Sequence, residues 1–88
     1  MAKNQLKSSK KEKAKGDPDL LKLGKRIRSL RIERGYKSAE KFALDNQLSR
    51  VHYGRWEAGQ KNISYKSLRI LAKAFKLSLS EFLSEGLD

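Results

Sequence analysis

The segment Ser49-Arg50-Val51-His52-Tyr53-Gly54-Arg55-Trp56-Glu57-Ala58-Gly59 carries both a start and a stop signal for a short helix. Ser49 is a favourable N-cap, and glycine is the usual residue just past a helix C-terminus. Tyr53 and Trp56 are three residues apart, so they share one face, which can turn inward. The opposite face carries Arg50, Val51, His52 and Arg55, and it is cationic at its start.

This outward face offers the chemistry that a nucleic-acid groove requires. Arginine and histidine donate hydrogen bonds to purine acceptors, valine offers apolar surface to a thymine methyl group, and positive charge attracts phosphate. Taken alone, the segment fits an ordinary amphipathic helix with a solvated basic face at least as well. The rest of the chain must therefore decide between the two interpretations.

The charge of the chain favours a polyanionic partner. Its 88 residues include 21 Lys and Arg against 10 Asp and Glu, a formal net charge of +11. Nucleic acid is the first candidate partner and an anionic membrane surface is the second. No apolar run approaches the roughly 18 residues that span a bilayer, and no hydrophobic signal segment follows the basic N-terminus. We therefore expect a cytoplasmic, nucleoid-associated protein without a membrane-spanning segment.

Length and residue types argue against catalysis. The chain is long enough for one small domain, which leaves little room for a deep enzyme cleft. It has no cysteine, so disulfides and thiolate metal sites are excluded, and its single histidine, His52, argues against a zinc cluster. No paired-carboxylate or nucleophile–histidine constellation stands at plausible spacing. We expect no catalytic residue, no metal, no cofactor and no small-molecule substrate.

Two regions differ in composition. Residues 1–16 are rich in lysine, and Leu6 is the only large aliphatic residue after Met1, which is too little apolar surface to offset chain entropy. We predict a disordered arm there, which acts either as a solubilising tail or as an electrostatic arm with salt-sensitive phosphate contacts. Residues 17–88 are predicted to form one folded domain.

This second region carries the signals of five short helices. Asp17-Pro18 is typical of an N-cap followed by proline at the first helical position of a helix that ends near Gly35. Serines cap the next three helices at positions 38, 49 and 64, and Ser78-Leu79-Ser80-Glu81 has the spacing of a capping box. No alternating strand pattern or internal repeat is found, so an all-α fold is predicted. The expected inward residues are Leu20, Leu23, Ile27, Leu30, Arg34, Phe42, Ala43, Leu68, Leu71, Ala72, Phe75, Phe82 and Leu83, and the expected solvated cations of the first helix are Lys22, Lys25, Arg26 and Arg28.

The order of these pieces resembles the phage-repressor family of helix-turn-helix domains, the Cro/cI-type or XRE-like group. The matching pieces are LGKRIRSLR at 23–31, SAEKFA at 38–43, LSRVHYGRWEAG at 48–59 and the ending at 64–83. The resemblance implies a compact five-helix, lambda-repressor-like domain over 17–88 whose second motif helix lies in the major groove of duplex DNA. This implication agrees with the charge and with the outward face of residues 49–58.

Three features depart from the family pattern. The motif's first helix often begins with a phosphate-binding glutamine, where this chain has Ala39, although Ser38, Lys41 and the free amides of that helix can still hold a phosphate. The turn of the motif usually has a glycine where this chain has Gln47, so we expect Asn46 to take the left-handed conformation instead. An apparent extra residue also stands between 35 and 38.

The resemblance and the residue chemistry together suggest roles. Arg31 and Glu57 match a pair that joins the first helix to the recognition helix in the family, and the alternative is two unrelated surface charges. Gly54 weakens a helix, which close approach to DNA or to another helix would explain, and plain tolerance is the alternative. Arg50 or Arg55 is best suited to guanine. The candidates for base contact are Arg50, Val51, His52 and Arg55, and those for contact with the DNA backbone are Ser38, Ala39, Lys41, Ser49, Gly54, Lys61 and Asn62.

We therefore expect a sequence-specific regulator of transcription that binds double-stranded DNA. One small helix reads few base pairs, so a homodimer on a palindromic operator is expected, with half-sites about 34 Å apart and a subunit contact within residues 75–87. The alternative from another class is a protein-interaction module, such as an antitoxin-type DNA-binding partner of a toxin. A binder of structured RNA is less favoured, because the chain lacks a row of exposed aromatic residues for stacking bases.

Overall fold

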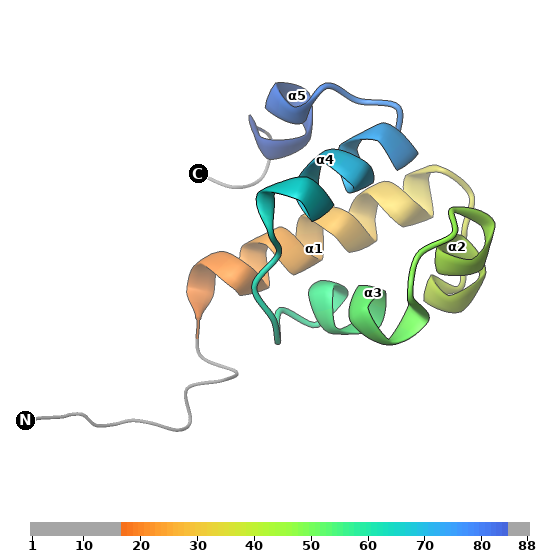
Figure 1. The fold of residues 1–88 in the computed structure, drawn as a ribbon, viewed down its shortest axis with the longest axis horizontal. Coiled ribbons are helices and arrows are strands. Elements are labelled where there is room, and N and C mark those ends of the chain that lie inside the picture. The colour runs from red at the N-terminus through yellow and green to blue at the C-terminus, as the bar shows by residue number, and fades with distance from the viewer. Residues whose placement is uncertain (1–16, 85–88) are drawn as a thin grey trace, which may run out of the picture.

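The computed structural model describes residues 17–84, and these form five helices joined by short turns (Figure 1). The helices are α1 (Pro18–Glu33), α2 (Ala39–Asp45), α3 (Arg50–Glu57), α4 (Tyr65–Ala74) and α5 (Leu79–Ser84). The predicted five-helix, all-α fold is confirmed. The arm that was predicted over 1–16 lies outside the described residues. Within 17–84, no helix has the length and apolar character needed to cross a membrane.

Each helix begins at the residue that the sequence indicated. The Asp17 carboxylate accepts hydrogen bonds from the amides of residues 19 and 20 at 3.0 and 3.3 Å. The Oγ atoms of Ser38, Ser49 and Ser64 each accept the amide three residues on, at 3.1–3.3 Å. At α5 the capping box is reciprocal: Ser78 Oγ accepts the Glu81 amide, and Glu81 Oε1 accepts the Ser78 amide at 2.8 Å. That second bond lowers the pKa of Glu81, since it stabilises the ionised carboxylate.

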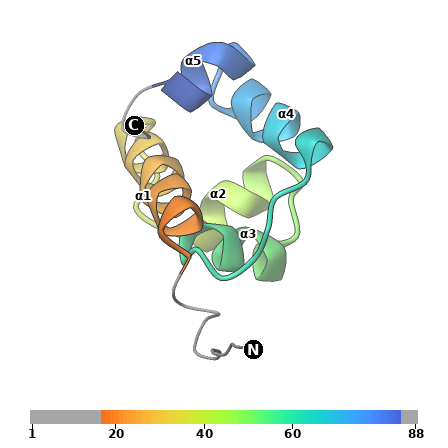
Figure 2. The same ribbon diagram turned by 90° about the vertical axis from the view of Figure 1, so that its left-hand side faces the viewer.

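The helices surround one core (Figure 2). In Figure 1, α3 lies along the lower edge, α5 lies at the top, and α1 passes between them. Phe42 on α2 is central, with its ring 5.0–5.1 Å from those of Tyr36, Tyr53 and Phe75, and Phe75 in turn contacts Phe82. These rings tie α2, α3, α4 and α5 together. The buried apolar residues are Ile27, Leu30, Phe42, Ala43, Tyr53, Leu71, Ala72, Phe75 and Phe82, all of them predicted to face inward, while Leu20, Leu23, Leu68 and Leu83 are half-buried.

The turn between α2 and α3 corrects one expectation. Gln47 itself takes the left-handed conformation, with φ of 59°, whereas Asn46 has φ of −104°. The amides of Gln47 and Leu48 donate to the carbonyls of Leu44 and Ala43, a Schellman closure that requires the left-handed residue at position 47. Asn46 instead uses its side chain, and Nδ2 donates to the Phe42 carbonyl at 2.9 Å.

Two arginines of α1 also differ from the expectation. Arg26, expected to be solvated, donates from Nε to the Phe82 carbonyl and from Nη2 to the Glu81 carbonyl, both at 3.0 Å. Arg34, expected on the inward stripe, is exposed and donates to the Phe75 carbonyl at 2.7 and 3.1 Å. Both side chains donate to backbone carbonyls at the C-terminal ends of α4 and α5, where helical carbonyls commonly lack an amide partner from the next turn. Lys22, Lys25 and Arg28 are exposed, as predicted.

The subunit contact expected within 75–87 stays a prediction, but two residues of that range belong to the core. Phe75 and Phe82 are fully buried, so neither side chain is available to a second subunit. They are core residues because α5 folds back over α4 and covers them. Residues 85–87 lie outside the described part of the chain.

Candidate nucleic-acid interface

The two faces of α3 separate as the sequence predicted. Tyr53 is fully buried and Trp56 is half-buried. On the opposite side the four side chains proposed for base contact are exposed, namely Arg50, Val51, His52 and Arg55. Since α3 forms the lower edge of the molecule in Figure 1, no other described helix covers this outward face. The arrangement exposes two guanidinium groups, one imidazole and one apolar side chain on the same face.

A buried polar network fixes the inner face of α3 to α1. Arg31 Nε and Nη2 donate to the two carboxylate oxygens of Glu57 at 2.6 and 3.2 Å. Arg31 Nη1 donates to the Tyr36 carbonyl at 2.8 Å, and the Tyr53 hydroxyl donates to Glu57 Oε2 at 2.5 Å. The expected pair is therefore present, and the alternative of two unrelated surface charges is wrong.

Electrostatics within this network favour its charged arginine and its neutral phenol. The hydrogen bond with Glu57 raises the pKa of Arg31, although burial acts in the opposite direction. Burial raises the pKa of Tyr53, and the hydrogen bond that its hydroxyl donates to Glu57 raises it further. Arg31 thus stays charged and Tyr53 stays protonated at neutral pH, so the network holds one arrangement.

Gly24 is a positioning residue that the sequence analysis missed. A Cβ atom at this position would stand 2.4 Å from the carbonyl oxygen of Glu57 and 2.8 Å from that of Trp56. The backbone of α1 therefore touches the C-terminal end of α3, and only glycine leaves room for that contact. The available signal was the presence of glycine inside a helix, where it costs about 1 kcal/mol relative to alanine.

Gly54, by contrast, has open space around it. A Cβ atom built there meets nothing within 4 Å in the described part of the chain. This excludes close helix packing as the reason for glycine at this position. Close approach to DNA and plain tolerance are the two explanations that remain.

The residues expected to contact the DNA backbone form two groups at opposite ends of α3. One group lies at the start of α2, to the right of α3 in Figure 1, and the other lies in the loop that leads to α4. Lys41 Nζ already binds Asp45 at 3.2 Å, so phosphate would have to replace or share this partner. Ala39 is half-buried and packs on the core, so only its backbone can serve. The first group is Ser38, Ala39 and Lys41, the second is Lys61 and Asn62, and between them lie Ser49, the N-cap of α3, and Gly54 within that helix.

An acidic residue also lies at this interface, and the sequence analysis did not anticipate it. Glu40 Oε2 on α2 stands 3.4 Å from Arg50 Nη1 at the start of α3. Ten residues separate the two in sequence, so no helical spacing could have paired them. The contact depends on how the turn around Gln47 sets α2 against α3.

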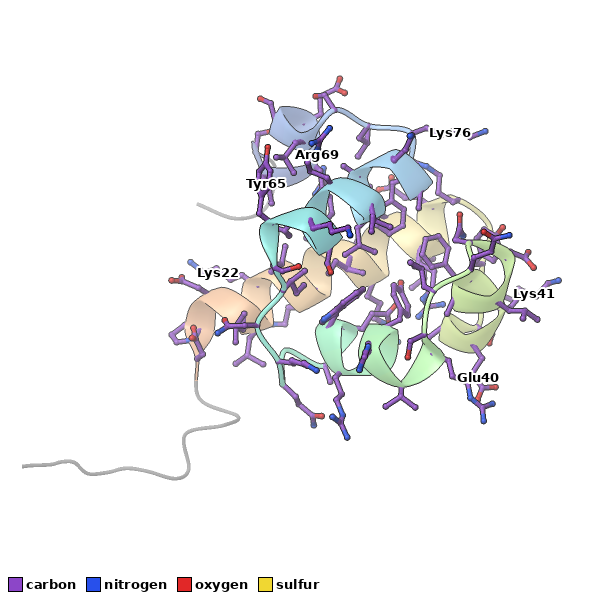
Figure 3. The ribbon with its side chains drawn as sticks, in the orientation of Figure 1. Lys22, Glu40, Lys41, Tyr65, Arg69 and Lys76 are labelled. Carbon is purple, nitrogen blue, oxygen red and sulfur yellow. The ribbon has the colours of Figure 1, made fainter. Side chains whose placement is uncertain are left out.

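The described residues also form a hollow away from α3, and they present no metal site. Within 17–84, no group of three or more His, Cys, Asp or Glu residues is placed to hold a metal ion. A hollow of about 500 Å³ lies along α4 and the start of α5, on the other side of the molecule from α3. Tyr65 and Arg69 project there from α4 (Figure 3). Its lining is Tyr65, Lys66, Arg69, Ile70, Ala72, Lys73, Leu77 and Leu79.

Comparison with known proteins points to one family. The model of the helix-turn-helix family matches residues 27–82. Control protein C.MunI from Mycoplasma sp. is 31% identical over 65 residues, which cover 74% of this chain and 88% of that protein.

Two solved structures extend this similarity. The restriction-modification controller protein C.AhdI from Aeromonas hydrophila superposes with a TM-score of 0.68 and 36% identity, covering 75% of this chain and 98% of that one. The controller protein C.Esp1396I, solved as a tetramer in complex with its natural 35 base-pair operator, has a TM-score of 0.67 and 27% identity over 76% of this chain and 87% of that one. The similarity therefore spans most of residues 17–84.

Proposed function

We propose that this chain, which belongs to the helix-turn-helix family of DNA-binding transcription regulators, reads its operator by placing α3 in the major groove. One observation carries the proposal: α3 exposes two arginines, a histidine and a valine on one face, while a buried network fixes its other face. A helix held rigidly on a scaffold can present side chains to base edges in one orientation. Arg50 and Arg55 are assigned to guanine, and Val51 and His52 to neighbouring bases.

Contacts with phosphate would supply most of the affinity. The two groups of backbone candidates flank α3, which fits the two strands that border one groove. We assign this role to Ser38, Ala39 and Lys41 on one side, to Lys61 and Asn62 on the other, and to Ser49 and Gly54 between them. Residues 17–88 would then be the DNA-binding domain, and the lysines of 1–16 would add salt-dependent contacts.

The names of the relatives suggest which genes are regulated. C.AhdI and C.Esp1396I are controllers of restriction–modification, and C.Esp1396I assembles on an operator. We infer that this chain likewise controls a restriction–modification system from the cytoplasm, on the nucleoid, as a homodimer on a palindromic operator. This favours a regulator over an antitoxin-type interaction module and over an enzyme. The hollow along α4, with exposed Tyr65 and Ile70, is the surface we assign to the second subunit.

Selection from a randomised duplex pool tests the proposal. The enriched duplex is then measured by fluorescence anisotropy at low and near-physiological salt. Arg50→Ala and Arg55→Ala should each lower the preference for one base pair by about 1–3 kcal/mol. Arg28→Ala is the matched control, because it removes an exposed arginine of α1.

A palindromic site that the wild-type chain enriches, and that either α3 variant reads less well, supports a sequence reader. Binding that selects no sequence and disappears as salt rises contradicts it. Such salt-sensitive, unselective binding is what a basic interaction module would show if its true partner were not an operator.

A further inference from the structure

Glu40 on α2 is an acidic side chain that contacts the first residue of α3. Its Oε2 atom stands 3.4 Å from Arg50 Nη1, and the two side chains remain 74% and 71% exposed. The Arg50 side chain has no other hydrogen bond or ion pair within the described residues. We propose that Glu40 is a specificity-determining residue, which orients the Arg50 guanidinium for reading a base. This inference rests on the function proposed above.

The contact with Glu40 leaves the Nε/Nη2 edge of the Arg50 guanidinium group free. Glu40 engages only Nη1, so Nε–H and the Nη2 hydrogens on the other edge of the planar group remain available. Two parallel N–H groups form the fork that matches N7 and O6 of guanine. A carboxylate on Nη1 therefore restricts the guanidinium without occupying the atoms that would contact the base.

The position of Glu40 fits this role. It is the second residue of α2, and Figure 3 shows it at the lower end of that helix, on the side where the outward face of α3 lies. Lys41 points to the side of the molecule and binds Asp45. Glu40 and Arg50 line the same hollow between the two helices, together with Ser38, Lys41, Leu44 and Leu48. The contact thus joins the two helices of the motif at the DNA-facing surface.

The negative charge of Glu40 distinguishes a role in specificity from a role in affinity or in folding. A carboxylate close to phosphate weakens binding to any duplex, so a residue kept there only for affinity would not be acidic. An exposed pair also contributes little to folding. Removing the charge should therefore strengthen binding to unrelated DNA and weaken discrimination, while the thermal midpoint of unfolding stays unchanged.

The experiment uses the full chain and two duplexes. One duplex is the site enriched by the wild-type chain, and the other replaces the single base pair at which Arg50→Ala loses its preference. Glu40→Gln should reduce the ratio of the two dissociation constants about two- to fivefold, the range for an exposed charge pair. Asp45→Asn is the matched control, because it removes the same charge from the same helix but touches Lys41. The control should keep the wild-type ratio.

A double variant closes the cycle. In the Arg50→Ala background, Glu40→Gln should leave the ratio unchanged, because no guanidinium remains to be oriented. An equal loss in that background, or a loss at a different base pair, overturns the inference in favour of direct contact between Glu40 and a base. An unchanged ratio in Glu40→Gln alone overturns it as well. If the wild-type chain selects no sequence, the proposed function itself fails; if it selects one, only the role of Glu40 is at stake.

Discussion

At the scale of single residues, the carboxylate of Glu57 joins more partners than any other side chain of α3. It accepts two hydrogen bonds from Arg31 and one from the Tyr53 hydroxyl, and its side chain is almost entirely buried. Removing one partner of a buried pair leaves the other charge without compensation in a place from which water is excluded. The stability of the domain should therefore depend on this single group.

Glu57→Gln should lower the free energy of unfolding by about 3 kcal/mol, because the buried Arg31 guanidinium loses its counter-charge. Chemical denaturation followed by circular dichroism measures the change. Glu33→Gln is the control, since Glu33 also pairs with an arginine but is 64% exposed, and an exposed pair contributes under about 1 kcal/mol. Equal losses in the two variants would show that the network does not stabilise the fold.

At the scale of helices, the closest approach is that of α1 to the end of α3. The two backbones meet at Gly24, and the carbonyl groups of residues 56 and 57 face it. Gly59 follows the C-cap of α3 with φ of 71°, and a Cβ atom added there would stand 2.9 Å from the Leu21 Cα. Small residues on two elements thus set the distance between the scaffold helix and the reading helix.

A pair of alanine substitutions tests this packing. Gly24→Ala should destabilise the domain by about 1–3 kcal/mol, because the new methyl group would overlap the Glu57 carbonyl and push α1 from α3. Gly54→Ala should stabilise it by up to about 1 kcal/mol, since alanine favours a helix and meets open space. Denaturant titrations give both values. A destabilised Gly54→Ala chain, or a neutral Gly24→Ala chain, would contradict this account.

DNA binding by the Gly54→Ala variant distinguishes the two remaining explanations for glycine at this position. If DNA comes close to α3 at this position, Gly54→Ala should bind the selected duplex more weakly although the free protein is more stable. Unchanged affinity would leave tolerance on an exposed face as the explanation.

The helices themselves could be predicted from the sequence because their signals are local. Asp17 and the capping serines act on amides two or three residues away, and each of them does so in the structure. The inward stripes follow from helical spacing in the same way. Fold class, helix starts and most of the core were therefore available from the residues alone.

The features that the sequence could not provide depend on contacts between distant residues. Gln47 and Lys76 take positive φ because the chain must turn there, although neither residue favours it. Arg26 and Arg34 reach carbonyls 41 to 56 residues away. For the candidate site, the exposed face of α3 was visible in its spacing, whereas the pairing of Glu40 with Arg50 required the angle between two helices.

At the scale of the whole molecule, the hollow along α4 is the surface that a second subunit would cover. Ile70 is 42% exposed there, and Tyr65 on the same helix is also exposed beside Arg69. The hollow faces away from the DNA-facing edge that Glu40 marks in Figure 3. A subunit bound there would leave α3 of both copies free to reach separate half-sites.

Ile70→Glu should prevent this association, because a charge would be buried in an apolar contact. Affinity for the full palindrome should fall about 100-fold as the second binding event ceases to be intramolecular, while affinity for an isolated half-site stays the same. Sedimentation velocity and anisotropy measure the two effects. Ile32→Glu is the control, since Ile32 is 52% exposed on α1 and does not line the hollow. A dimer that persists in Ile70→Glu would place the contact elsewhere.

The separation between the two faces of α3 has a consequence for descent with modification. The side chains of Val51, His52 and Arg55 are exposed and have no hydrogen bond or ion pair within the described residues, whereas the network that holds the helix lies wholly on its other side. Exposed substitutions usually change stability by no more than about 0.5 kcal/mol. A lineage can therefore exchange these three side chains, and with them its preferred operator, without first acquiring compensating mutations in the scaffold.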